Sequence, residues 1–205
     1  LNTTFGSSIY EPVALELAKG RFKTVKIQVK PNNLVSSEAE SVIQMIMDEI
    51  TTARRSPNTI QETNEIRNVA QKGGAHQVKL RNFDIFLEAF DGSIHVMDIK
   101  TVKPNIGEFE DFKRMLLMWT ASELQKNPTT QIHPYIAIPY NPYEPKEYKR
   151  WTMKGILDLS QDVLVASEMW DFIGGKGSYD DLLDCFQIAG EKLRPKIDSY
   201  FSRFN

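Results

Sequence analysis

Residues 81–100 read RNFDIFLEAFDGSIHVMDIK and carry Asp84, Asp98 and Lys100 within two largely apolar runs. The runs are separated by an Asp-Gly pair at 91–92, which predicts a β-hairpin. A strand that buries an unpaired charge loses stability, so these three side chains need partners. A divalent cation between the two carboxylates would be one such partner.

The length of the turn decides whether the three charged side chains share a face. A two-residue turn would put Asp84 opposite Ile99, and Asp84 and Asp98 would then point to opposite faces. A three-residue loop over 91–93, with Gly92 left-handed, brings them to one face. It predicts pairs of Phe90 with Ile94, Phe86 with Asp98 and Asp84 with Lys100. We therefore expect an odd-length turn or a bulge here.

The residue types suit hydrolysis of a phosphodiester. Asp84 and Asp98, with the backbone carbonyl of Ile99, are expected to bind Mg²⁺, with Mn²⁺ as a substitute, because these ions prefer oxygen ligands. Lys100 is expected to orient or help deprotonate the attacking water and to stabilise charge on the phosphorus oxygens. The spacing also fits a simpler alternative, in which Asp98 and Lys100 form a cross-strand ion pair at a sheet edge.

Composition limits the class of protein. The chain has 205 residues, is 41% hydrophobic and 25% charged, and has a net charge of −2. This length suits one domain over 1–205, with a core at about 37–140 and a helical part at about 152–205. The single Cys185 excludes an internal disulfide and indicates a cytoplasmic protein. We expect no membrane span, and the start at Leu1 leaves open whether residues precede it.

A capped helix precedes the hairpin. Ser37 and Glu40 fit a capping box that opens a helix running to about Arg54. Glu40 is our choice over Glu38 for the site, because apolar residues follow it at three, six and seven positions and place it beside the buried stripe. A capping carboxylate in solvent is the alternative.

Two further elements follow the hairpin. Residues 107–126 have the spacing of a helix whose apolar stripe includes Trp119, and 132–140 form the expected last core strand. Lys113 and Arg114 lie off that stripe, where solvated charge or a phosphate contact would suit them. Lys79, Arg81 and Lys103 are candidates for DNA contacts.

The arrangement of these residues resembles the PD-(D/E)XK nuclease superfamily. Asp84 matches the first acid, Asp98 the second and Lys100 the lysine, while Phe83 replaces the usual proline. The resemblance implies a mixed α/β fold with an αβββαβ core and a mixed central sheet flanked by helices. It also implies a glutamate from the first helix, which Glu40 would supply.

A second segment narrows the resemblance. Residues 168–183, EMWDFIGGKGSYDDLL, are similar to a Trp-x-Phe-x-Gly-Gly segment of type II restriction endonucleases, and the chain most resembles the TdeIII/MjaII group. For Trp170 and Phe172 core packing is the simpler interpretation. The resemblance implies a homodimer that cleaves double-stranded DNA at a short site, GGNCC-like, without a nucleotide cofactor. A repair or recombination nuclease on the same core, and a module that binds DNA or protein without cutting, are the alternatives.

Overall fold

The computed structural model describes residues 6–100, 106–148 and 153–202. The strands are β1 (Thr24–Val29), β2 (Leu34–Ser36), β3 (Ala75–Gln77), β4 (Phe83–Glu88), β5 (Ile94–Ile99), β6 (Ile132–Ile138) and β7 (Val163–Val165). Five of them form one sheet in the order β1-β4-β5-β6-β7, and β2 pairs with β3 separately. The pairs on the β1 side are antiparallel and those on the β7 side parallel, so the sheet is mixed, as predicted.

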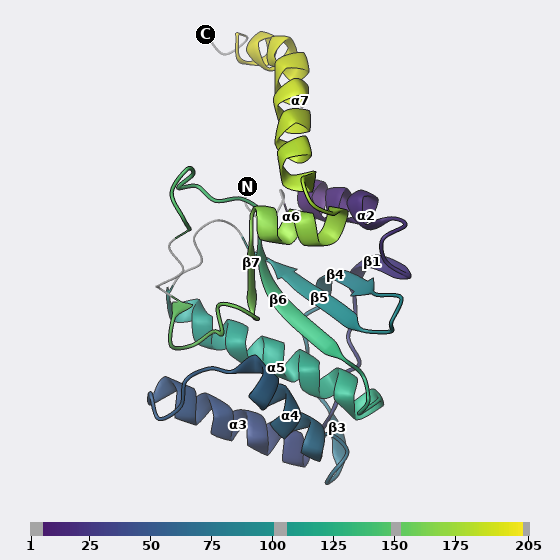
Figure 1. The fold of residues 1–205 in the computed structure, drawn as a ribbon, viewed down its shortest axis with the longest axis vertical. Coiled ribbons are helices and arrows are strands. Elements are labelled where there is room, and N and C mark those ends of the chain that lie inside the picture. Colours follow the sequence, from purple (N-terminus) through teal and green to yellow (C-terminus); the bar gives the residue numbers. More distant parts are fainter. Residues whose placement is uncertain (1–5, 101–105, 149–152, 203–205) are drawn as a thin grey trace.

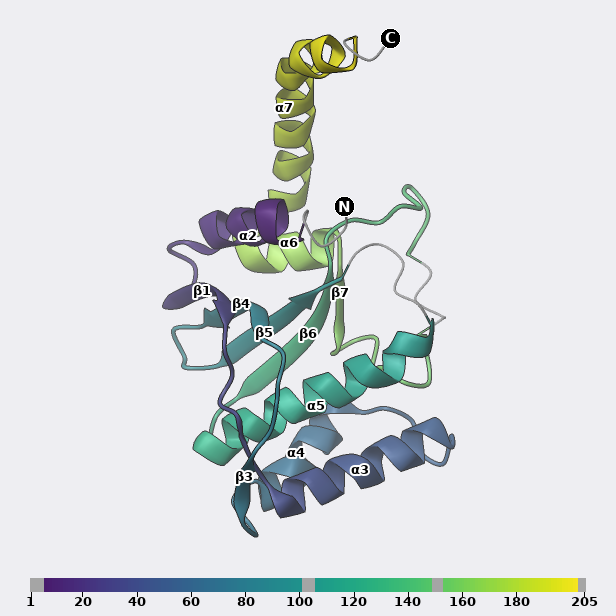
Figure 2. The ribbon, with the colours of Figure 1, turned by 180° about the vertical axis from the view of Figure 1, so that it is seen from behind.

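Helices cover the sheet on two sides. They are α2 (Glu11–Ala18), α3 (Ser37–Thr51), α4 (Thr59–Val69), α5 (Phe109–Lys126), α6 (Ser167–Gly174) and α7 (Ser178–Phe201), with the short η1 (Gly6–Tyr10) and η2 (Ile106–Glu108). Figures 1 and 2 show α3, α4 and α5 on one side, α2 and α6 on the other, and α7 extending away from the rest. The strand order places the hairpin strand β5 in the middle of the sheet, between these two layers of helices.

The order α2, β1, β4, β5, α5, β6 along the chain gives the predicted αβββαβ pattern. The helix over 37–51 was expected to open this pattern, but it lies in an insertion between β1 and β4. The first helix is instead α2. The sheet also reaches beyond the predicted core of 37–140, because β1 precedes it and β7 lies within 152–205, which was expected to be helical.

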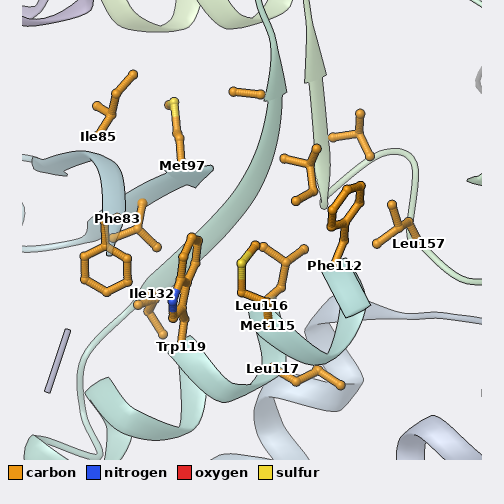
Figure 3. Packing of buried hydrophobic residues seen from close by; sticks show 14 of the residues in the cluster. Phe83, Ile85, Met97, Phe112, Met115, Leu116, Leu117, Trp119, Ile132 and Leu157 are labelled. Atoms are coloured by element: carbon orange, nitrogen blue, oxygen red, sulfur yellow. The ribbon is translucent and has the colours of Figure 1, made fainter. Parts of the chain in front are cut away.

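The core is built mainly where α5 packs on the sheet. The predicted apolar stripe of α5 is buried, and Trp119 lies edge-on to Phe83 with ring centroids 4.9 Å apart (Figure 3). The indole Nε1 of Trp119 also donates to the carbonyl of Arg81, at 3.1 Å. Full burial of one large apolar side chain contributes about 1.5–3 kcal/mol, so this contact anchors the start of β4 to the helix.

The start of α3 differs from the predicted capping box. Ser36, and not Ser37, is the N-cap, since its side chain accepts the amide N–H of Ala39 at 3.1 Å. The buried Ser36 hydroxyl also donates to the carbonyl of Val69, which ties α3 to the end of α4. Two adjacent serines offered the same local signal, and this tertiary contact favours the first of them.

Lys113 is fully buried on α5, so the expectation of a solvated charge was wrong. Its Nζ lies 2.6 Å from Oε2 of Glu62 on α4 and 2.7 Å from Oδ2 of Asp162, which precedes β7. Burial alone would lower the pKa of Lys113, but the two carboxylates raise it above its ordinary value. The ammonium therefore remains charged and links three elements that are distant in sequence.

The start of α7 lies against the body of the protein, and the rest of the helix extends away from it (Figures 1 and 2). Tyr179 in its first turn is buried and donates its hydroxyl to Glu144 at 2.8 Å. Farther along, α7 exposes the large apolar side chains Leu183, Phe186, Ile188, Leu193, Ile197 and Tyr200. Within the part of the chain that the structure describes, neither α7 nor another helix is long and apolar enough to span a membrane.

Candidate active site

The hairpin of β4 and β5 has the predicted parity but not the predicted register. Glu88 pairs with Ile94 and Ile85 with Met97, so the continuation of this register places Asp84 opposite Asp98. Both side chains therefore lie on one face, as an odd-length turn requires. The predicted pairing of Phe86 with Asp98 was wrong by two residues, because Phe86 lies opposite Val96.

The turn explains the shifted register. The amide of Ala89 donates to the carbonyl of Ser93 at 2.9 Å, which leaves Phe90, Asp91 and Gly92 as a three-residue loop. Oδ1 of Asp91 accepts both the amide and the hydroxyl of Ser93, so Ser93 ends the strand ladder rather than belonging to the loop. Gly92 has a φ of 85°, the left-handed conformation that was predicted for it.

Asp84 occupies the point where the ladder between β4 and β5 stops. Its Oδ2 accepts the backbone N–H of Ile99 at 2.7 Å, and its Oδ1 accepts Nε2 of Gln28 at 3.0 Å. Hydrogen bonds from a backbone N–H hold a carboxylate in one orientation. The Asp84 side chain is thereby directed between the two strands and toward Asp98.

Asp98 on β5 and Lys100, the first residue after β5, form a close pair. The Lys100 Nζ lies 2.6 Å from Oδ2 of Asp98, and it also lies over the ring of Phe112, 5.1 Å from the centroid. Asp98 is 5% exposed and belongs to the central strand of the sheet, so this pair does not fit the alternative of an ion pair at a sheet edge.

Burial raises the pKa values of both acids against the charges and hydrogen bonds around them. For Asp98, burial raises the pKa, Lys100 lowers it, the charge of Asp84 raises it and Arg81 lowers it. For Asp84, burial raises the pKa against hydrogen bonds from the Ile99 amide and Gln28 and against the charge of Lys100. The nearby cations therefore offset only part of the cost of burial, and an additional positive charge would offset more of it.

A third acid, which the sequence analysis missed, lies beside Asp84. Glu11 at the start of α2 is 4% exposed, and its Oε1 accepts Nε2 of Gln28 at 2.9 Å. Burial raises the pKa of Glu11, Gln28 lowers it, and the charge of Asp84 raises it. The available signal was the position of Glu11 in the helix just before the first strand of the sheet, but its spacing alone does not distinguish it from a solvent-exposed acid.

Glu40 is not brought into this group. It lies on α3, where its Oε2 is 3.1 Å from Nε2 of His76 on β3, and about half of its side chain is exposed (50%). The expectation that it joins the site rested on α3 being the first helix of the core. Because α2 holds that place, Glu11 takes the position that was expected of Glu40.

A cleft of about 580 Å³ opens over the site. Its lining residues are Gln28, Lys79, Leu80, Arg81, Asn82, Asp84 and Asp98. Two of the predicted DNA-contact candidates, Lys79 and Arg81, therefore lie at the same cleft as the acids, and the third, Lys103, lies outside the described residues. Basic side chains beside buried acids could hold a phosphate group close to Asp84 and Asp98.

Two carboxylates and a backbone carbonyl are the donors that this site offers to a small divalent cation. Oδ2 of Asp98 is buried, and the Lys100 ammonium, 2.6 Å away, is its ion-pair partner. Within the described ranges no three or more His, Cys, Asp or Glu side chains form a metal-binding group, so a cation here would take its other ligands from outside the protein. Two carboxylates with a backbone carbonyl would leave the remaining positions to water and phosphate, the mixture that Mg²⁺ prefers.

The buried charge of Glu11 predicts a pH-dependent gain in stability for Glu11→Gln. A raised pKa means that ionised Glu11 destabilises the folded state at pH 7, and that this cost disappears as the pH falls below its ordinary value of 4.5. We expect the metal-free variant to melt above wild type at pH 7 and to show no gain near pH 4. Thermal denaturation in EDTA measures both.

The matched control for this prediction is Glu38→Gln. Glu38 is an exposed acid in the first turn of α3, where a negative charge is favourable. Its removal should therefore bring no stability at either pH. Equal melting temperatures for Glu11→Gln and wild type at pH 7 would contradict the prediction.

Trp170 is a structural residue. It is 1% exposed and its Nε1–H donates to the carbonyl of Pro139 at 2.7 Å, so the interpretation of Trp170 as a core residue is confirmed.

His133 on β6 stacks on His95 of the neighbouring strand β5, with 4.8 Å between the ring centroids. It does not line the cleft.

Comparison with known proteins gives concordant matches. A family model described as "HinfI: Type II restriction endonuclease, HinfI" matches residues 1–190. The chain is 28% identical to the type II restriction enzyme MjaII of Methanocaldococcus jannaschii over 211 residues, which cover 97% of this chain and 55% of that protein. It is 25% identical to the type II restriction enzyme HgiCII of Herpetosiphon aurantiacus, over 93% of this chain and 70% of HgiCII.

The type II restriction enzyme HgiEI, also of Herpetosiphon aurantiacus, is 29% identical over 110 residues, 52% of this chain and 39% of HgiEI. The chain thus spans about half the length of MjaII and less of HgiEI.

Proposed function

The chain belongs to the HinfI family of type II restriction endonucleases, and on this premise we propose that it hydrolyses phosphodiester bonds of double-stranded DNA at a short specific site. The observation that carries the proposal is the presence of Asp84 and Asp98 at one cleft that also has basic residues, with Lys100 paired to Asp98. We further propose Mg²⁺ as the cofactor, with Mn²⁺ as a substitute, and the cytoplasm as the location.

In this proposal the acids bind the cation and the lysine acts on the attacking water. Asp84, Asp98 and the carbonyl of Ile99 would hold the cation, which when bound would lower the pKa of a water molecule and polarise the phosphate. Lys100 is held by Asp98 and Phe112, so its ammonium can orient the attacking water and stabilise negative charge on the phosphorus oxygens. Lys79 and Arg81 at the cleft would hold the DNA backbone.

We assign the third carboxylate of the site to Glu11 rather than Glu40. Glu11 shares Gln28 with Asp84, and its charge acts on Asp84, whereas Glu40 pairs with His76. Glu11 would thus add negative charge beside the cation or accept a proton from a bound water.

A plasmid assay tests the reaction and the proposed homodimer together. We expect discrete fragments in Mg²⁺ and none in EDTA, and we expect a plasmid with GGNCC sites to be cut while one without them is not. A homodimer on a two-fold symmetric site would cut both strands in one encounter, so linear DNA should appear without accumulation of nicked circles. Absence of cleavage of any substrate would favour a module that binds without cutting. Cleavage directed to branched DNA would favour a repair or recombination nuclease.

A further inference from the structure

The side-chain amide of Gln28 connects two acids from different elements. Its Nε2 lies 2.9 Å from Oε1 of Glu11 on α2 and 3.0 Å from Oδ1 of Asp84 on β4. A primary amide nitrogen carries two hydrogens, so both bonds can form at once. The two carboxylate oxygens are therefore held no farther apart than these two hydrogen bonds reach.

The backbone at Gln28 is unusual for a strand. Gln28 has a φ of 52°, a left-handed conformation that residues other than glycine adopt infrequently. Ile27 pairs with Ile85 and Val29 pairs with Phe83, so Gln28 lies opposite Asp84. These two residues do not form a regular strand pair themselves. The departure from regular strand geometry thus falls at the residue that reaches the acids.

Glu11 has little other compensation for its charge, whereas Asp84 also accepts the Ile99 amide N–H. Glu11 is buried, and within residues 6–100, 106–148 and 153–202 no cationic side chain forms an ion pair with it. The positive ends of the Gln28 amide N–H groups lie between the two carboxylates. Gln28 itself is exposed, so this bridge can open toward the cleft without disturbing the core.

We propose that Gln28 is a positioning residue whose amide occupies Oδ1 of Asp84 and joins it to Glu11, and that it thereby competes with the divalent cation for Asp84. The proposal rests on the proposed function of the site. Without a cation, the amide offsets the repulsion between the acids and keeps Glu11 turned toward Asp84. When a cation takes Oδ1 of Asp84, the amide must leave or turn, and its hydrogen bond to that oxygen is given up.

Two substitutions at this position should have opposite effects on metal affinity. In Gln28→Asn the side chain is one methylene shorter and cannot bridge both acids, while asparagine tolerates the left-handed backbone. We expect this variant to bind Mn²⁺ about tenfold more tightly than wild type, the equivalent of one lost competing hydrogen bond. In Gln28→Lys an ammonium occupies the same space, and we expect Mn²⁺ affinity to fall about tenfold or more.

The experiment is a titration of the metal-free full chain with Mn²⁺ in the absence of DNA. Binding is measured by calorimetry and by the electron spin resonance signal of free Mn²⁺. A merely structural role for Gln28 would weaken binding in both variants. Unchanged or weaker binding by Gln28→Asn would therefore overturn the proposal.

A third variant separates this proposal from the proposed function. If wild type binds Mn²⁺ no better than Asp98→Asn does, the metal-dependent function fails and the role of Gln28 fails with it. If binding depends on Asp98 but is the same in wild type and Gln28→Asn, only the role of Gln28 is overturned.

Discussion

Asp98→Asn is expected to reduce DNA cleavage by more than about a thousandfold at saturating Mg²⁺. The substitution keeps the shape of the side chain but removes the buried charge that lies 2.6 Å from the Lys100 ammonium. It therefore weakens metal binding and also releases Lys100 from the position in which it can meet the attacking water. Cleavage rates on a plasmid under single-turnover conditions measure the loss.

The matched control is Glu40→Gln, an acid on α3 that pairs with exposed His76. Its cleavage rate should stay within about twofold of wild type, because surface ion pairs contribute little. Circular dichroism of both variants checks that each is folded. A normal rate for Asp98→Asn, or a rate for Glu40→Gln as low as that expected for Asp98→Asn, would refute the assignment of the site.

Lys113→Met is expected to lower the free energy of unfolding by about 3–5 kcal/mol. The loss has a physical cause in the two partners, since Glu62 and Asp162 are both fully buried and would be left next to each other without a cation. For a chain of this length such a loss corresponds to a fall in Tm of about 10 °C. Urea denaturation followed by tryptophan fluorescence measures the free energy directly.

Arg114→Met provides the comparison on the same helix. Arg114 donates a hydrogen bond to the side-chain oxygen of Gln44 at the surface. Its replacement by Met should change the free energy of unfolding by no more than about 0.5 kcal/mol. Neutralising the partners as well, in Lys113→Met with Glu62→Gln and Asp162→Asn, should restore part of the loss, because no unpaired ion then remains. A loss below about 1 kcal/mol for Lys113→Met alone would show that the cluster is not a stability determinant.

What could be predicted from sequence was local. Asp84, Asp98 and Lys100 belong to one hairpin, so alternation along two strands and the parity of one turn were enough to place them on a single face. The apolar stripe of α5, with Trp119, follows from helical spacing in the same way. In both cases the partners lie within one or two elements.

What could not be predicted depends on which elements meet. Glu11 is separated from Asp84 by more than seventy residues, and only the packing of α2 beside β1 and β4 makes it a neighbour of the site. Lys113 looked like a surface charge because its two acidic partners come from α4 and from the segment before β7. The exact hairpin register was missed because it depends on hydrogen bonds that Ser93 donates to the Asp91 carboxylate rather than on the apolar pattern.

The register of β4 against β5 also decides where the charges of the site lie. A slip of β5 by one residue against β4 would make Met97 and Ile99 exchange places with Asp98 and Lys100 relative to the two faces of the sheet. Such a slip would bury the wrong side chains and remove Asp98 from the cleft in a single step. The pairing of β5 with β4 on one edge and with β6 on the other therefore maintains the core and the site together.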